Sequence, residues 1–144
     1  MTITEFLKDG VPFLAGITED QASYLARAAE QKPVPSGHTV IFQGATIDGL
    51  YVIAAGKVSV YVRSVKKREL VKVAELGPGE VFGETSVVEF TTAGATIKSA
   101  SADTLVFLIP ELDFRKILDT DPELKSRTLA LIEERRKSQP KLKN

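Results

Sequence analysis

The spacing of hydrophobic and polar residues changes twice along the chain and divides it into three parts. In the first part, apolar residues follow Thr18 at helical intervals, and Thr18 with Gln21 forms a capping box. In the middle part, valines at every second position of 58–62 alternate with polar residues, which is typical of a half-buried strand. In the third part, Asp121 and Pro122 provide an N-cap and a first-turn proline, so they predict the start of another helix.

The middle part, from about Ser36 to Ile109, is expected to be all β. Short runs of β-branched and aromatic residues alternate there with glycine turns, of which 77–79 (Gly-Pro-Gly) is the strongest. The pattern predicts strands at about 39–42, 50–55, 58–63, 71–73, 95–99 and 104–109. Short strands at this spacing indicate a sandwich, a barrel or a jelly roll. Four aromatic residues of these strands and turns are expected in the core: Phe42, Tyr51, Phe82 and Phe107.

Helices are expected on both sides of the β part. The first is predicted to stop near Gln31, because Pro33 and Pro35 follow. Two more are predicted at 111–118 and 122–137. The 144 residues thus form one expected domain, whose parts are an N-terminal helical part (1–35), the β part (36–109), the C-terminal helices (110–138) and a tail (139–144).

The charge balance limits the kinds of partner. The chain has 19 basic and 19 acidic residues, so its formal net charge is zero. A protein that coats nucleic acid or an anionic membrane needs a surplus of positive charge, so we expect no direct nucleic-acid or membrane binding. The longest nearly apolar stretch, 50–56, is too short to span a bilayer, and the first ten residues do not resemble a secretory signal. The cytoplasm is therefore the expected compartment.

Catalytic chemistry is not indicated. The chain has no cysteine, which excludes disulfides, thiolate zinc sites and cysteine nucleophiles. Its one histidine, His38, lacks neighbours with metal-ligand spacing, and no nucleophile–base pair is recognisable from the spacing. We expect a protein that is not an enzyme and that carries no metal and no cofactor.

The segment 76–86 (LGPGEVFGETS) carries the most specific chemistry of the sequence. Its glycines allow the backbone to approach a ligand closely, and N–H groups at such a turn can point at an anion such as a phosphate. A glutamate beside that turn, Glu84, can accept a hydrogen bond from a sugar hydroxyl. The segment is thus a candidate site for a small phosphorylated sugar or a nucleotide, although glycine turns are common in β proteins and Glu84 can also serve in a cap or a salt bridge.

Several spaced motifs resemble the cyclic-nucleotide-binding domain family, which includes regulatory domains of catabolite activator protein, cAMP-dependent protein kinase and nucleotide-gated channels. The motifs are 11–14 (VPFL), 35–61, 76–79 (LGPG), 82–84 (FGE) and 121–124 (DPEL). The resemblance implies a mainly β fold, a double-stranded β-helix of the jelly-roll or β-roll type, with an N-terminal helix and two C-terminal helices. It also implies a regulatory function in signal transduction and cAMP or cGMP as the candidate ligand.

Residues 82–97 correspond to the phosphate-binding cassette of that family. The resemblance assigns Gly83 to a backbone donor and Glu84 to the ribose. It also assigns Thr128 and Arg127 on the last helix to positions that can face a nucleobase, with packing or solvent exposure as the alternative. The family's cassette arginine falls on Ala93, and Gly94 follows it without a hydroxyl. The candidate ligand-binding residues are Phe82, Gly83, Glu84, Thr85, Ser86, Thr91, Thr92, Ala93, Gly94 and Thr128.

The replacement at Ala93 leaves two hypotheses open. There is no arginine between Arg68 and Arg115, and the one lysine of the segment 79–100, Lys98, is expected to point outward. In the first hypothesis, the domain is a ligand-sensing module with weak or altered cyclic-nucleotide binding. Alternatively, it is a degenerate module without a ligand that acts in protein–protein interaction or homodimerisation through the last helix. In both cases the chain ends too soon after that helix for the DNA-binding domain of the family's transcription factors, so we expect output through a partner, another domain of a longer parent protein, or self-association.

Overall fold

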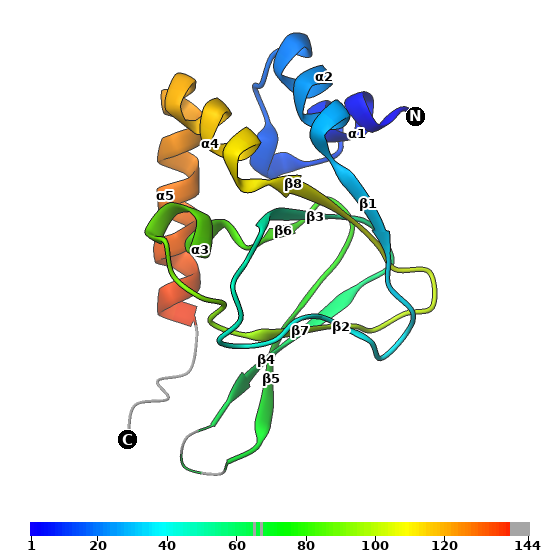
Figure 1. The fold of residues 1–144 in the computed structure, drawn as a ribbon, viewed down its shortest axis with the longest axis vertical. Helices are drawn as coiled ribbons and strands as arrows, with labels where there is room; N and C mark the ends of the chain where they lie inside the picture. Colours follow the sequence, from blue (N-terminus) through cyan, green and yellow to red (C-terminus); the bar gives the residue numbers. More distant parts are fainter. Residues whose placement is uncertain (65, 67, 139–144) are drawn as a thin grey trace.

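The chain folds into two four-stranded antiparallel sheets that are flanked by helices, as the computed structural model of residues 1–64, 66 and 68–138 shows (Figure 1). The first sheet has the order β1 (Glu30–Pro33), β8 (Leu105–Pro110), β3 (Gly49–Ala55) and β6 (Val81–Phe82). The second has the order β2 (Thr39–Ile41), β7 (Thr96–Ser99), β4 (Val58–Arg63) and β5 (Leu70–Leu76). The expected β-roll with flanking helices is confirmed, and six of the strands lie within a few residues of their predicted positions.

Helices lie before and after the sheets. They are α1 (Ile3–Asp9), the 3-10 helix η1 (Pro12–Leu14), α2 (Glu19–Ala28), α3 (Glu84–Glu89), α4 (Glu111–Thr120) and α5 (Pro122–Ser138). The helices α1, α2 and α4 gather over the first sheet, whereas α5 descends beside the roll and passes α3 (Figure 1). Within the described residues, no helix is both long enough and apolar enough to cross a membrane.

The two central strands of the first sheet, β3 and β8, are buried on both faces. In β3, Leu50 and Val52 belong to the core beneath the helices, whereas Tyr51 and Ile53 belong to the core between the two sheets. Strand β8 alternates in the same way. Successive side chains of a strand point to opposite faces of the sheet. A strand that is packed against other elements on both faces therefore needs apolar residues at successive positions. This explains why residues 50–54 form an unbroken apolar run rather than an alternating one.

The N-terminal part differs from the expectation. The helix predicted to run to about Gln31 ends at Ala28, and residues 30–33 form strand β1, which pairs with β8. Pro33 is compatible with this strand because β1 lies at an edge of its sheet, where a missing backbone donor costs least. The sequence offered no alternation in Glu30–Pro33, so only the pairing with β8 identifies it as a strand.

The expected core position of Phe42 is also wrong. Its side chain is 65 % exposed, because it follows the end of β2 at a turn, whereas Tyr51, Phe82 and Phe107 are buried as predicted. The turn is closed by the amide of Ala45, which donates to the carbonyl oxygen of Phe42.

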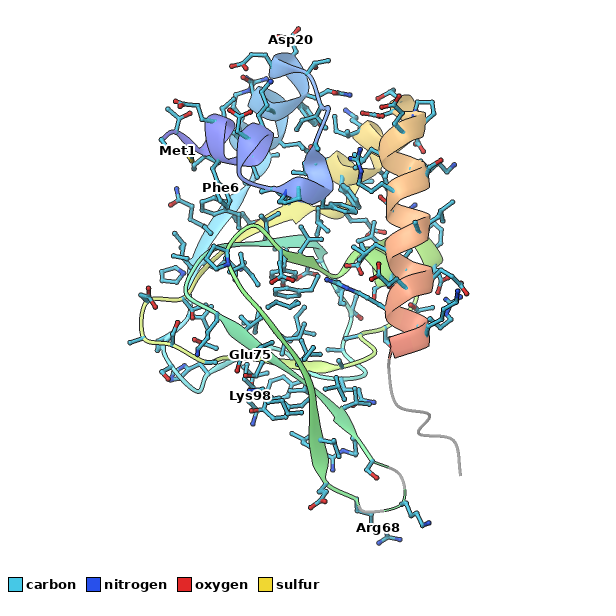
Figure 2. The ribbon with its side chains drawn as sticks, turned by 180° about the vertical axis from the view of Figure 1, so that it is seen from behind. Met1, Phe6, Asp20, Arg68, Glu75 and Lys98 are labelled. Carbon is cyan, nitrogen blue, oxygen red and sulfur yellow. The ribbon has the colours of Figure 1, made fainter. Side chains whose placement is uncertain are left out.

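The hairpin of β4 and β5 extends away from the rest of the molecule. Arg68 lies at its tip, at the opposite end of the molecule from Asp20 of α2 (Figure 2). Both Arg68 and Lys66 of this turn are exposed. The described basic residues of the turn therefore lie on a solvated extension and far from the helices.

The turn between β6 and α3 depends on a glycine. Gly83 adopts φ +93°, which side chains rarely tolerate, and a Cβ atom there would lie 2.7 Å from the carbonyl oxygen of Gly49. Immediately before the turn, the rings of Phe82 and Tyr51 are stacked with centroids 4.9 Å apart. This glycine thus allows α3 to begin directly against strand β3.

Packing of α4 generates the first testable expectation. Phe114 is fully buried and its ring lies 6.3 Å from that of Phe13, whereas Leu112 on the same helix is 76 % exposed. We expect Phe114→Ala to lower the free energy of unfolding by about 3–5 kcal/mol, since it removes a ring from a packed core. The matched change Leu112→Ala should stay within about 0.5 kcal/mol of the wild type. Urea denaturation measures both, and equal losses would contradict the described core.

A second expectation concerns Gly83. Gly83→Ala should destabilise the protein by at least about 1–2 kcal/mol, because the left-handed conformation alone has that cost and the Gly49 carbonyl must also move. Gly94→Ala is the matched control, since a Cβ atom at Gly94 would meet no other atom within 4 Å and its φ is not positive. Thermal denaturation of both variants checks this. A Gly83→Ala variant as stable as Gly94→Ala would contradict the described turn.

Candidate functional site

A cavity of about 250 Å³ lies at the side of the roll, where the second sheet, the α3 segment and the end of α5 meet. Apolar side chains from both sheets and from α5 form most of its wall: Ile41, Ile47, Val60, Val73, Ala74, Leu76, Phe82, Ile97 and Ile132. Polar groups come from two short segments, 83–86 and 91–92, and charge comes from Glu84, Arg135 and Arg136. The cavity therefore combines apolar walls with one polar edge, as small-molecule sites do.

The structure brings nearly all of the predicted site residues together. Every candidate in the segments 82–86 and 91–94 lines the cavity. Thr128 does not line it: the side chain is fully buried, and its hydroxyl donates to the carbonyl oxygen of Leu124 at 2.8 Å. In this structure Thr128 thus packs within α5, which is the alternative left open for it.

Glu84 is the buried charged group of the site. Its Oε1 accepts a hydrogen bond from Nη1 of Arg135 at 2.7 Å, while Oε2 is buried and has no hydrogen-bond partner among the described residues. Burial raises the pKa of the Glu84 carboxyl, and the nearby Arg135 guanidinium and the residue's own backbone oppose that rise. A buried acceptor without a partner is costly, so Oε2 is the atom of this cavity best suited to receive a hydroxyl or N–H donor.

The two arginines at the cavity were not identified from the sequence as site residues. Arg135 also donates from Nη2 to the carbonyl oxygen of Val81 at 2.6 Å, so one guanidinium bridges both sides of the β6–α3 turn. Arg136 donates to both carboxylate oxygens of Glu89, at 2.9 and 2.7 Å. The sequence showed only a basic helix end there, and no local pattern links position 135 to position 84.

The backbone of the loop after α3 is hydrogen-bonded to residues 44 and 45, and residues 90–95 include no cation. The amide of Ala93 donates to the carbonyl oxygen of Ala45, and the carbonyl oxygen of Ala93 accepts from Gly44, both at 2.8 Å. Ser86 Oγ donates to the carbonyl oxygen of Thr92 at 3.2 Å. Ala93 is buried at the cavity wall, so its methyl group takes the place where the resemblance expects an arginine.

Lys98 does not compensate for that arginine. Its ammonium group lies 5.6 Å from the centroid of the Tyr61 ring, and the residue does not line the cavity, whereas its neighbour Ile97 does. The expected outward orientation of Lys98 is therefore confirmed. Among the described residues, the cations that line the cavity are Arg135 and Arg136, and both belong to α5.

The described residues offer no grouping suited to bind a metal ion. No cluster of three or more histidine, aspartate and glutamate side chains is present among them. The cavity's chemistry is instead that of reversible recognition, with a buried carboxylate oxygen for a donor, hydroxyls and backbone groups at one edge, and apolar surface for a planar or aliphatic group.

Comparison with known proteins agrees with this geometry. Residues 31–121 match the family described as cyclic nucleotide-binding domain. A cAMP-dependent protein kinase regulatory subunit from Neurospora crassa is 32 % identical over 109 residues, which cover 71 % of this chain and 28 % of that protein. The chain thus spans little more than a quarter of that relative's length.

Two solved structures share the fold. The catabolite activator protein of Thermus thermophilus has a TM-score of 0.76 and 24 % identity, with 88 % of this chain and 58 % of that chain covered. The regulatory subunit of a cAMP-independent protein kinase A from Trypanosoma brucei, as a triple mutant bound to cAMP, has a TM-score of 0.76 and 22 % identity, with 98 % and 47 % covered. Domains of this kind regulate rather than catalyse. Since the family match covers more than half of its residues, the chain belongs to the cyclic nucleotide-binding domain family.

Proposed function

We propose that this chain is a non-enzymatic, ligand-sensing regulatory domain whose ligand occupies the cavity beside Gly83 and Glu84. The observation that carries the proposal is the buried Oε2 of Glu84, an acceptor that has no partner among the described residues and lines a cavity of about 250 Å³. A ligand hydroxyl would satisfy that acceptor, and the apolar wall would receive a planar ring. Family membership supports this assignment of the cavity.

The proposed ligand is a cyclic nucleotide, cAMP or cGMP, bound weakly or with altered selectivity. The contacts would come from the segments 82–86 and 91–94, where backbone groups and hydroxyls can meet a phosphate. The place of the cassette arginine is taken by Ala93, so a charge-assisted fork to the phosphate is missing from that loop.

The distribution of charge around the cavity supports a ligand that is held less by its phosphate than by a hydroxyl group. The loop with Ala93 contributes hydroxyls and backbone groups but no cation, and the two arginines of the cavity come from α5 and are engaged with Glu84 and Glu89. Recognition of a hydroxyl by Glu84 consequently has more support here than recognition of a phosphate by an arginine.

A second candidate function is that of a degenerate interaction module in the cytoplasm, which binds a protein partner or a second copy through α5. The observation that favours it is the state of Glu84, because one of its carboxylate oxygens is already engaged by Arg135 of the same chain. Leu129, which is 49 % exposed on α5, offers apolar surface for such a contact. In either case, output would pass through a partner or a further domain.

Substitution at position 93 tests the proposed ligand. Ala93→Arg should tighten the binding of cAMP or cGMP by roughly 10- to 1000-fold, because a charged hydrogen-bonding group adds on the order of 1.5–3 kcal/mol or somewhat more. Ala93→Met is the matched control, since it adds a long side chain without charge and should not tighten binding. Isothermal titration calorimetry gives the dissociation constants, and equal affinities of the two variants would show that Ala93 does not face the ligand's phosphate.

The wild-type protein provides the wider test. Thermal shifts with saturating cAMP, cGMP and a cyclic dinucleotide should show stabilisation by at least one of them, since binding to the folded state raises its stability. If none of them changes the melting temperature of the wild type or of Ala93→Arg, cyclic-nucleotide sensing is wrong. Sedimentation equilibrium would then test the interaction module by its oligomeric state.

A further inference from the structure

We infer that Arg135 is a positioning residue for ligand binding: it fixes the Glu84 carboxylate through Oε1 so that Oε2 accepts a hydroxyl of the ligand in the cavity. The contact with a ligand hydroxyl rests on the proposed function, whereas the contact between Arg135 and Glu84 is present in the protein without a ligand. It gives α5 a part in the site that neither the segment 82–97 nor its resemblance to a known cassette assigns.

The geometry of the guanidinium carries the argument. Nη1 of Arg135 lies 2.7 Å from Oε1 of Glu84, and Nη2 lies 2.6 Å from the carbonyl oxygen of Val81. A planar guanidinium presents its donors in a rigid fork, so two acceptors bound at once fix its orientation. These acceptors lie on the two sides of Gly83, and Arg135 therefore holds the carboxylate at a set angle to the turn.

The two carboxylate oxygens of Glu84 differ in their contacts, and this difference points to a ligand. Oε1 is occupied by Arg135, while Oε2 is buried without a partner among the described residues and lies at the cavity. A carboxylate that served only to anchor α5 would gain by pairing both oxygens, as Glu89 does with Arg136. One oxygen is thus engaged by the protein, and the other remains available for a donor from outside.

The positive charge of Arg135 also affects the protonation of the Glu84 carboxyl. An ionised carboxyl accepts hydrogen bonds at both oxygens, whereas a protonated one turns one oxygen into a donor. Burial raises the pKa of Glu84 and so favours its protonation, whereas the Arg135 charge opposes it. Among the described residues, the other charged side chain that lines the cavity is Arg136 of α5, which is paired with Glu89 of α3. Arg135 is therefore the cation that opposes protonation of Glu84.

The free protein offers a test that needs no ligand. In Arg135→Gln, the carboxyl carbon of Glu84 should titrate at a higher pH than in the wild type, as followed by ¹³C NMR, because the charge that opposes protonation is gone. Arg127→Gln is the matched control: Arg127 also lies on α5 and donates to two carbonyl oxygens, those of Phe13 and Ala15, away from the cavity. In that variant Glu84 should titrate as in the wild type.

The ligand test uses cAMP and 2′-deoxy-cAMP, which lacks the one free hydroxyl of the ribose ring. The wild type should prefer cAMP by roughly tenfold or more, the ratio expected for a hydrogen bond to a charged group. Arg135→Gln should lose most of this preference, because Glu84 is then neither fixed nor held as an acceptor, whereas Arg127→Gln should keep it. A general loosening of α5 would instead weaken both nucleotides equally and leave their ratio unchanged.

Arg135→Lys serves as the conservative variant and as a replacement if Arg135→Gln does not fold. The lysine retains the charge but cannot span Glu84 and Val81 with a rigid fork, so Glu84 should titrate close to the wild-type pH while the preference for cAMP is only partly recovered. The inference is overturned if Glu84 titrates at the wild-type pH in both Arg135 variants. It is also overturned if Arg135→Gln keeps the wild-type preference for cAMP over 2′-deoxy-cAMP. Absence of nucleotide binding by the wild type overturns the proposed function instead, and the NMR titration still decides the role of Arg135.

Discussion

The burial of strands β3 and β8 on both faces is the constraint on which the rest of this structure depends. The inner face of β3 and β8 needs a second sheet against it, and the outer face needs a layer of helices. The chain meets the second need with segments from both ends, since α1, α2 and α4 cover the same sheet (Figure 1). The two helical parts of the domain are thus tied together by one core, and the helices that follow β8 have little freedom to lie elsewhere.

Helix α5 belongs to two environments because of this arrangement. Leu124, near its start, packs in the core beneath the helices, whereas Ile132 and Arg135 reach the cavity near its end. Between these two regions, Arg127 donates to the carbonyl oxygens of Phe13 and Ala15. Helix α5 therefore links the core beneath the helices to the wall of the cavity.

The sequence by itself determined a β-rich middle part and the two helices that follow it. The local signals for these features are the alternation in 58–62, the turn at 77–79 and the cap at Asp121. The β-roll among the possible β folds, and the cavity edge at 82–86 and 91–94, were expected from the resemblance of several spaced motifs to a known family. Local patterns could not identify β1, because Glu30–Pro33 has no alternation and becomes a strand only by pairing with β8. They also placed Phe42 wrongly, since an aromatic residue in a β-rich run is buried only if the strand continues past it.

Tertiary structure alone decided the chemistry of Glu84 and the role of α5. The partner of that carboxylate lies 51 residues away in the chain, and the pairing depends on where two helices meet rather than on any spacing in sequence. The same holds for Thr128, to which the family resemblance assigned a possible ligand contact but whose hydroxyl donates to a carbonyl oxygen of its own helix. Sequence patterns report the faces of elements, whereas a binding site depends on which faces the packed core brings together.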